Sequence, residues 1–93
     1  MRFFSFSPED YLDSRLWALG ERPLTVGCFG HDVRQLQAIL HRAHKEVPLD
    51  GYFEEKTLMA LLETQSWCNI PHSDTFELNK NGEAIINFLT NGR

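Results

Sequence analysis

GCFGHDVRQLQAIL at residues 27–40, followed by LDGYF at 49–53 and EKTLMALLETQ at 55–65, is the part of the sequence that decides the fold. The first segment predicts a glycine-rich turn that leads into an amphipathic helix. The Asp-Gly pair in the second predicts a tight turn. The third predicts a helix that begins near Glu54 or Glu55 and ends at about Ser66.

The helix after residue 30 has both a predicted start and a predicted buried face. Asp32 is its expected N-cap, with Gln35 three residues later in the position of a capping box. Its buried face is expected to consist of apolar residues at helical spacing: Val33, Leu36, Ile39 or Leu40, and Ala43.

Two further helices are expected outside this stretch. Ser7 and Pro8 have the pattern of a helix start, and Gly20 is typical of a helix end, so one helix should run to about Leu19. The last helix should begin between Asn81 and Glu83 and end at Asn91. We therefore predict an all-α fold, a small three-helix bundle with an additional N-terminal helix.

The length of 93 residues predicts one domain over 1–93, because two cores would each be too small. Within it, residues 1–22 are expected to be a helical extension packed on the core, and residues 23–93 to be the helical domain itself.

Composition excludes several classes of function. The formal net charge is −4 without a block of lysine or arginine, which argues against nucleic acid as a partner. No apolar run is long enough to cross a membrane, so membrane insertion is not expected. Glu9 and Asp10 interrupt the apolar start before a secretory signal could form. We expect a chain that is cytoplasmic as synthesised, with reduced cysteines.

The order and spacing of the central stretch resemble those of the peptidoglycan-binding domain-like family. The matching pattern is Gly27-x-x-Gly30-x-Asp32-Val33-x-x-Leu36-Gln37-x-x-Leu40, then Asp50-Gly51-x-Phe53, then Thr57-x-x-Ala60-Leu61-x-x-x-Gln65. The resemblance implies a compact bundle of three main helices that binds murein and does not cleave it. Phe53-Glu54 replaces the Phe-Gly of the family, Thr64 replaces an aromatic residue, and the usual glycine after the first helix is absent.

Nearly every matched position also has a structural explanation. The glycines suit turns and the apolar residues suit a core, while Gln37 and Gln65 are each expected to satisfy backbone groups of a neighbouring loop. The motif therefore indicates an architecture better than an activity.

A murein groove needs an apolar platform for sugar rings together with amides or carboxylates for hydroxyl groups. The predicted ligand-binding residues are Arg34, Asp50, Tyr52, Phe53, Gln65 and Trp67. For Phe53 a place in the core beneath the turn is the favoured alternative, whereas Tyr52 and Trp67 fit a half-exposed site as well as a structural role.

Neither a metal, a cofactor nor an enzymatic activity is expected. Metal-like spacing occurs in Cys28-x-x-His31, His41-x-x-His44 and Cys68-x-x-x-His72, but no pair repeats as a finger pattern, and we expect His41 and His44 on a solvated helix face. Asp50, Glu54 and Glu55 are better explained as a turn former and helix-dipole partners than as paired catalytic carboxylates.

Two functions follow as expectations. The first is a non-catalytic module that recognises bacterial cell-wall peptidoglycan, brought to the wall or periplasm by a partner, a phage or a lysis system. The alternative is an adaptor of the same fold that binds a protein partner, such as a hydrolase, phage or secretion component, through Trp17, Trp67 or the aromatic cluster at 3–6. An apolar surface patch without a polar groove would favour the adaptor.

Overall fold

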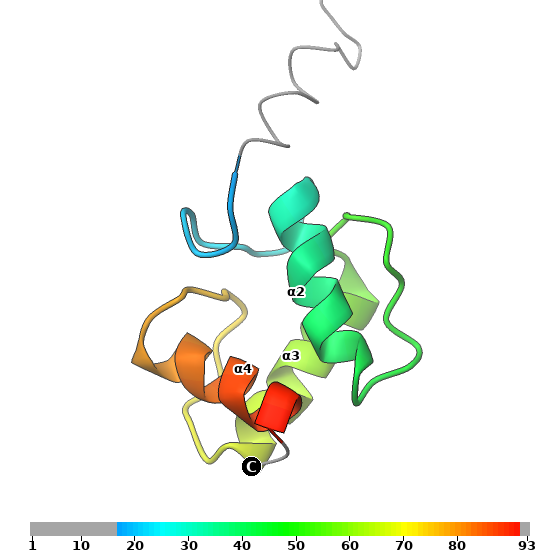
Figure 1. The fold of residues 1–93 in the computed structure, drawn as a ribbon. Coiled ribbons are helices and arrows are strands. Elements are labelled where there is room, and N and C mark those ends of the chain that lie inside the picture. The colour runs from blue at the N-terminus through cyan, green and yellow to red at the C-terminus, as the bar shows by residue number, and fades with distance from the viewer. Residues whose placement is uncertain (1–16, 92–93) are drawn as a thin grey trace, which may run out of the picture.

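The computed structural model describes residues 17–91, and these form an all-α fold of three helices joined by long loops (Figure 1). The helices are α2 (His31–His41), α3 (Glu55–Trp67) and α4 (Lys80–Asn91). Helix α2 packs against both α3 and α4. None of the helices in residues 17–91 is long and apolar enough to cross a membrane. The predicted all-α class is confirmed, and α3 and α4 begin and end within one residue of the predicted ranges.

Most of the predicted N-terminal helix, and with it most of the extension at 1–22, lies outside the described residues. The described part, Trp17–Leu19, is not helical, so the expected helix end at Leu19 is wrong. A turn occupies this position instead, in which the Glu21 N–H donates to the Ala18 carbonyl at 3.0 Å. Leu19 is partly buried and packs against the core.

The start of α2 differs from the predicted capping box. Gly30 is the N-cap residue with φ of 143°, and no side chain caps the helix. Asp32 lies in the first turn, where its carboxylate accepts hydrogen bonds from the Arg22 guanidinium at 2.8 and 3.1 Å. Gln35 Oε1 accepts from the Leu19 N–H at 3.3 Å. The box fails because glycine takes the cap position and both box side chains bind residues that precede the helix.

The loop before α2 is joined to the loop before α3 by backbone hydrogen bonds. The Gly30 N–H donates to the Gly51 carbonyl at 2.9 Å, and the Phe53 N–H donates to the Cys28 carbonyl at 2.9 Å. Gly51 has φ of 80°, and a Cβ there would lie 3.2 Å from the Gly30 carbonyl oxygen. The Asp-Gly turn therefore needs glycine for both its conformation and its close approach to Gly30.

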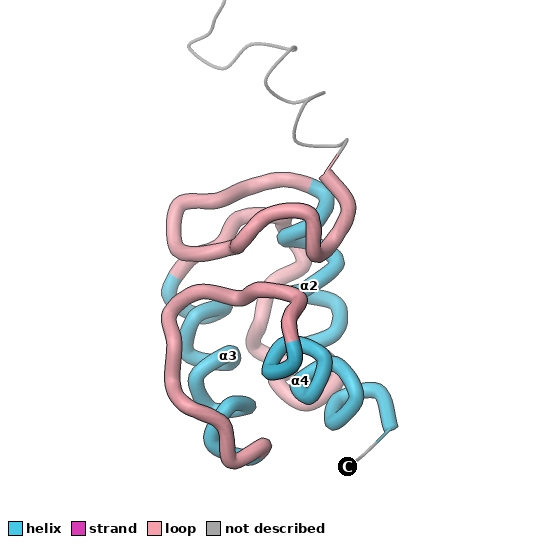
Figure 2. Tube along the Cα trace, turned by 90° about the vertical axis from the view of Figure 1, so that its left-hand side faces the viewer, coloured by secondary structure: helices cyan, strands magenta, loops and turns pink. Residues whose placement is uncertain are grey.

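A second pair of loops is joined in the same way near α4. Leu24 and Phe76 exchange backbone hydrogen bonds of 2.9 and 2.7 Å across an isolated antiparallel bridge. Figure 2 shows the loop that contains Phe76 running from the end of α3 to the start of α4. Gly82, in the first turn of α4, lies so close to the Glu77 carbonyl that an added Cβ would be 2.0 Å from the oxygen. The loop and the helix are thus packed backbone to backbone.

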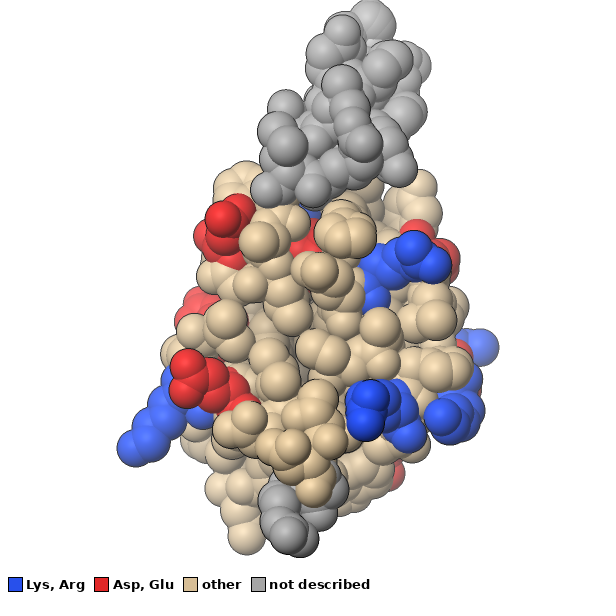
Figure 3. All heavy atoms as spheres, viewed as in Figure 1, with Lys and Arg blue, Asp and Glu red and all other residues tan. Residues whose placement is uncertain are grey.

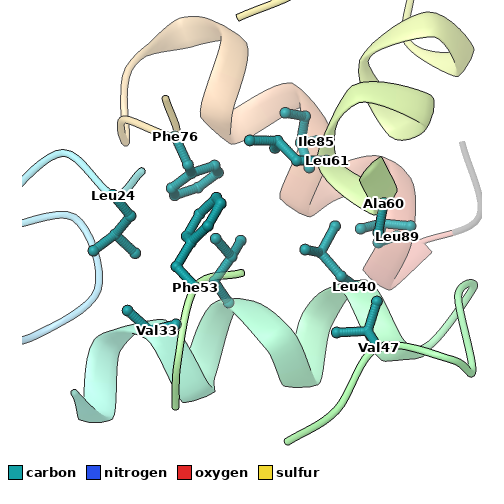
Figure 4. Packing of buried hydrophobic residues seen from close by; sticks show 11 residues of the cluster. Leu24, Val33, Leu40, Val47, Phe53, Ala60, Leu61, Phe76, Ile85 and Leu89 are labelled. Carbon is teal, nitrogen blue, oxygen red and sulfur yellow. The ribbon is translucent and has the colours of Figure 1, made fainter. Parts of the chain in front are cut away.

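The core is made by apolar residues of all three helices and of both pairs of loops (Figure 4). Phe53 and Phe76 come from different loops, and their rings lie next to each other within it. Val33, Leu36 and Leu40 are buried as predicted, but Ala43 is exposed because α2 ends at His41. The buried apolar residues are Leu24, Val33, Leu36, Leu40, Val47, Phe53, Ala60, Leu61, Phe76, Ile85 and Leu89.

Candidate functional site

The turn at 50–53 is held by Gln37, a fully buried side chain of α2. Its Oε1 accepts from the Gly51 N–H at 2.8 Å. Its Nε2 donates to the Tyr52 carbonyl at 2.9 Å, to Asp50 Oδ1 at 3.1 Å and to Thr57 Oγ1 at 3.1 Å. The prediction that Gln37 satisfies backbone groups of a neighbouring loop is confirmed, and its role here is structural.

Three of the predicted site residues come together at this turn. Arg34 donates to the Leu49 carbonyl at 3.1 Å, and Asp50 accepts from the Tyr52 N–H at 3.0 Å. Tyr52 is 54% exposed as a residue, and its ring stacks on Phe29 with a centroid separation of 5.9 Å. The polar atoms of Arg34 and Asp50 are therefore partly used within the chain, while Tyr52 presents an aromatic surface.

Phe53 does not belong to this surface. Its side chain has 0% exposure and lies against the other core residues. The prediction of Phe53 as a ligand-binding platform is wrong, because the backbone bonds to residues 27 and 28 direct its ring into the core.

Gln65 lies at a different place, beside the loop between α3 and α4. Its Nε2 donates to the Ser73 carbonyl at 3.1 Å, and its Oε1 accepts from the Ser73 N–H at 2.9 Å. Only 3% of the residue is exposed. The expectation that Gln65 satisfies a neighbouring loop is also confirmed, and this pairing shapes the loop as one wall of a hollow.

That hollow, which we call the α3–α4 hollow, has a volume of about 180 Å³. This is smaller than the usual small-molecule site of about 300–1,000 Å³, so the hollow has room for one group of a larger ligand. Pro71, Phe76 and Ile85 form its apolar part. Its polar lining is Gln65, Ser73, Thr75, Glu77, Asn79 and Asn81.

Several polar side chains of the α3–α4 hollow are already oriented by hydrogen bonds. Asn79 Oδ1 accepts from the Gly82 N–H at 3.0 Å, and its Nδ2 donates to Glu77 Oε1 at 3.4 Å. Ser73 Oγ accepts from the Thr75 N–H at 3.2 Å. The Asn81 side chain makes no hydrogen bond to any residue in the range 17–91, so its amide is available to a ligand.

A second, more open hollow of about 230 Å³ adjoins the first, because Glu77 and Asn79 line both. Its other side is formed by the turn at 20–23. Arg22 lies there with its guanidinium bonded to Asp32 and, at 2.7 Å, to the Phe29 carbonyl. The Asp32 hydrogen bond raises the pKa of Arg22, so this cation remains charged and paired.

Trp67 is remote from the 50–53 turn. It is the last residue of α3 and lies twelve residues after Glu55, the first, so the two ends of the helix are roughly 18 Å apart. Its indole stacks on His44 with centroids 4.8 Å apart and an interplanar angle of 9°. One face of this predicted platform is therefore covered, although 44% of the residue is exposed.

His44 is buried, so its predicted solvated position is wrong. It follows α2 rather than lying on it, and its Nε2 is 2.9 Å from Thr64 Oγ1. Because the Thr64 hydroxyl donates its hydrogen to the Ala60 carbonyl at 2.8 Å, His44 must donate from Nε2. Thr64, which stands where the resembled family has an aromatic residue, thus accepts a hydrogen bond from His44. An aromatic residue would instead fill this space with its ring.

The three cysteine–histidine or histidine pairs do not assemble a metal centre. Across residues 17–91 no group of at least three histidine, cysteine or acidic side chains is placed to hold an ion. Both cysteines are free and half-buried. Burial raises the pKa of the Cys68 thiol, which lies 3.8 Å from the Ala84 carbonyl.

The structure thus divides the predicted site residues among four places: the 50–53 turn, the core, the loop between α3 and α4, and the end of α3. It adds a polar hollow that residue-by-residue reasoning missed. Of the predicted set only Gln65 lines that hollow. The sequence feature that could have indicated this hollow is the polar loop at 72–79 between two helices, which is followed by Asn81. The face drawn in Figure 3 is uncharged over most of its middle, which differs from a basic surface that tracks nucleic acid.

No protein-family model matches this chain, and no curated protein sequence matches it. A solved structure described as the crystal structure of SleB N-terminal domain has a similar fold, with a TM-score of 0.68. The alignment covers 77% of this chain and 99% of the solved chain at 23% sequence identity. At this identity the likeness concerns the fold.

Proposed function

We propose that this chain is a non-catalytic binding module whose ligand is the peptidoglycan of bacterial cell walls. The observation that carries the proposal is the polar α3–α4 hollow, which Gln65 of the family-like pattern helps to form. The sequence resemblance over 27–65 and the fold shared with the SleB N-terminal domain support it at the level of architecture.

The composition of the hollow fits a wall polymer. Peptidoglycan presents hydroxyl and amide groups, which both donate and accept hydrogen bonds, and small apolar groups such as acetyl methyls. Amide and hydroxyl side chains at the rim, with Phe76 and Ile85 beneath, offer matching partners. Asp50, the acid weighed earlier for catalysis, is instead fixed by Gln37 and by the Tyr52 N–H.

The same geometry argues against the adaptor alternative. That alternative calls for an apolar patch in place of a polar groove, whereas the described surface contains a polar groove. The two exposed tryptophans also have partners within the chain, because Trp17 lies over the Arg22 guanidinium at 5.2 Å and Trp67 lies on His44.

Co-sedimentation with purified murein sacculi tests the proposal. The wild-type chain should pellet with sacculi, and soluble wall fragments should release it. Asn81→Trp, which fills the hollow from its rim, should leave the chain in the supernatant. Met59→Ser, on an exposed position of α3 that does not line the hollow, is the matched control and should pellet like wild type. A wild-type chain that stays in the supernatant would refute the proposal.

A further inference from the structure

The charge of the two adjoining hollows restricts which part of peptidoglycan they can bind. Glu77 lines both hollows and Glu21 lines the second. The cation in their lining, Arg22, is already paired with Asp32. A carboxylate ligand would therefore meet like charge without a free cation to bind it.

Neutral groups fit this lining better. The unbonded amide of Asn81 provides donors and an acceptor, and the Thr75 hydroxyl beside it can accept a further hydrogen bond. Hydroxyl and acetamido groups of a sugar have the complementary donors and acceptors. The apolar part formed by Pro71 and Ile85 suits the methyl of an acetyl group.

The arrangement of the hollows fits a linear chain. The two hollows, of about 180 and 230 Å³, meet at a shared rim formed by Glu77 and Asn79. A polymer that continues beyond one unit can occupy both, whereas a compact ligand fills one.

The geometry points to the N-acetylated amino-sugar strand as the part of peptidoglycan that these hollows bind, rather than the carboxylates of the stem peptides. This inference rests on the proposed function and names the portion of the ligand that is recognised. The strand runs across the Glu77–Asn79 rim, with Asn81 as its main hydrogen-bonding contact.

Amide chemical shifts of the ¹⁵N-labelled chain test the inference with three probes: the neutral tetramer of N-acetylglucosamine, glycan strands freed of stem peptides and with their lactyl carboxyl groups capped as neutral amides, and a free stem pentapeptide. At least one of the two sugar probes should shift the amides of Ser73, Thr75, Asn79 and Asn81. The pentapeptide should leave them unchanged. Shifts at these amides with the pentapeptide, or with neither sugar probe, would overturn the inference.

Substitutions at two adjacent positions of α4 test whether Asn81 contacts the sugar. Asn81→Ala should weaken the affinity for the sugar probe about five- to tenfold, the loss expected for one or two hydrogen bonds. Lys80→Ala is the control, because Lys80 is exposed and does not line either hollow. Equal affinity of Asn81→Ala and wild type, or a larger loss with Lys80→Ala, would contradict sugar recognition.

Failure of this inference is distinguishable from failure of the proposed function. A chain that pellets with intact sacculi but does not respond to either sugar probe binds another part of the wall, which overturns only the inference. A chain that does neither overturns both.

Discussion

Replacing Gln37 with leucine tests how the 50–53 turn is held. Leucine has nearly the same size, so the core keeps its volume while four hydrogen bonds are removed. The Gly51 N–H is buried, and Gln37 Oε1 is its acceptor. The substitution leaves that donor without a partner and releases the Tyr52 carbonyl.

The size of the effect follows from these groups. An orphaned buried N–H costs about 1–3 kcal/mol, and each of the other bonds contributes about 0.5–1.5 kcal/mol net. The added apolar surface of leucine offsets part of this loss, at about 25 cal/mol per Å² buried. We expect the free energy of unfolding to fall by about 2–4 kcal/mol, which corresponds to a Tm lower by about 10–30 °C for a domain of this size.

Urea unfolding followed by circular dichroism measures this change, with Gln35→Leu as the matched control on the same helix. Gln35 is exposed and makes a single 3.3 Å bond to the Leu19 N–H, so its substitution should stay within about 0.5 kcal/mol of wild type. If Gln37→Leu were as stable as Gln35→Leu, the reasoning that buried hydrogen bonds from Gln37 hold the turn would be refuted.

Three further predictions concern other contacts. Gly82→Ala should lower the free energy of unfolding by about 1–3 kcal/mol in urea titrations, because the Cβ would lie 2.0 Å from the Glu77 carbonyl oxygen; a change below about 0.5 kcal/mol would contradict that packing. Arg22→Ala should lower the free energy of unfolding, measured in urea titrations, by about 2–4 kcal/mol, because it leaves the buried Asp32 carboxylate without its cation. Since the pKa of Arg22 is raised, its contribution to stability is complete below the unfolded-state pKa and is lost only as pH rises through the higher folded-state value. The cost of Arg22→Ala should therefore be constant from about pH 6 to pH 9, and a steep slope in this range would contradict the assignment. Cys68, whose pKa is raised by burial, should react with iodoacetamide at pH 8 more slowly than a model-peptide thiol, as followed by mass spectrometry, and an equal rate would contradict its burial.

The fold was largely predictable because its determinants are local. Helical spacing of Val33, Leu36 and Leu40 and the positive-φ requirement of Gly51 depend on near neighbours in the sequence. The hydrogen bonds of the Gln37 and Gln65 side chains to loop backbone were also predictable. A polar side chain on a buried helix face needs hydrogen-bond partners, and the backbone of a neighbouring loop is the nearest source of them.

The errors arose where distant residues decide the outcome. Asp32 has the residue type of an N-cap, but Arg22 binds it from ten residues earlier in the chain. His44 looked like part of a polar helix face, yet the helix stops at His41 and the ring stacks on Trp67. Phe53 could serve a site or a core from its position after the turn, and only its backbone pairing with the earlier loop decides for the core.

The candidate site was less predictable than the fold, because a hollow depends on how two segments pack. The rim at 73–79 and Asn81 follow one another in the chain, but Gln65 reaches them from α3. Polar residues in an irregular loop are typical of any solvated surface, so their convergence appears only when the loop is placed against α4.

Binding to murein sacculi, measured as the bound fraction over a series of sacculus concentrations for wild type and Asn81→Trp together, tests the central claim most directly. The account predicts saturable binding of wild type and loss of binding when the α3–α4 hollow is filled, with Met59→Ser unchanged. Wild type that does not bind, or Asn81→Trp that is folded and binds as well as wild type, would contradict it.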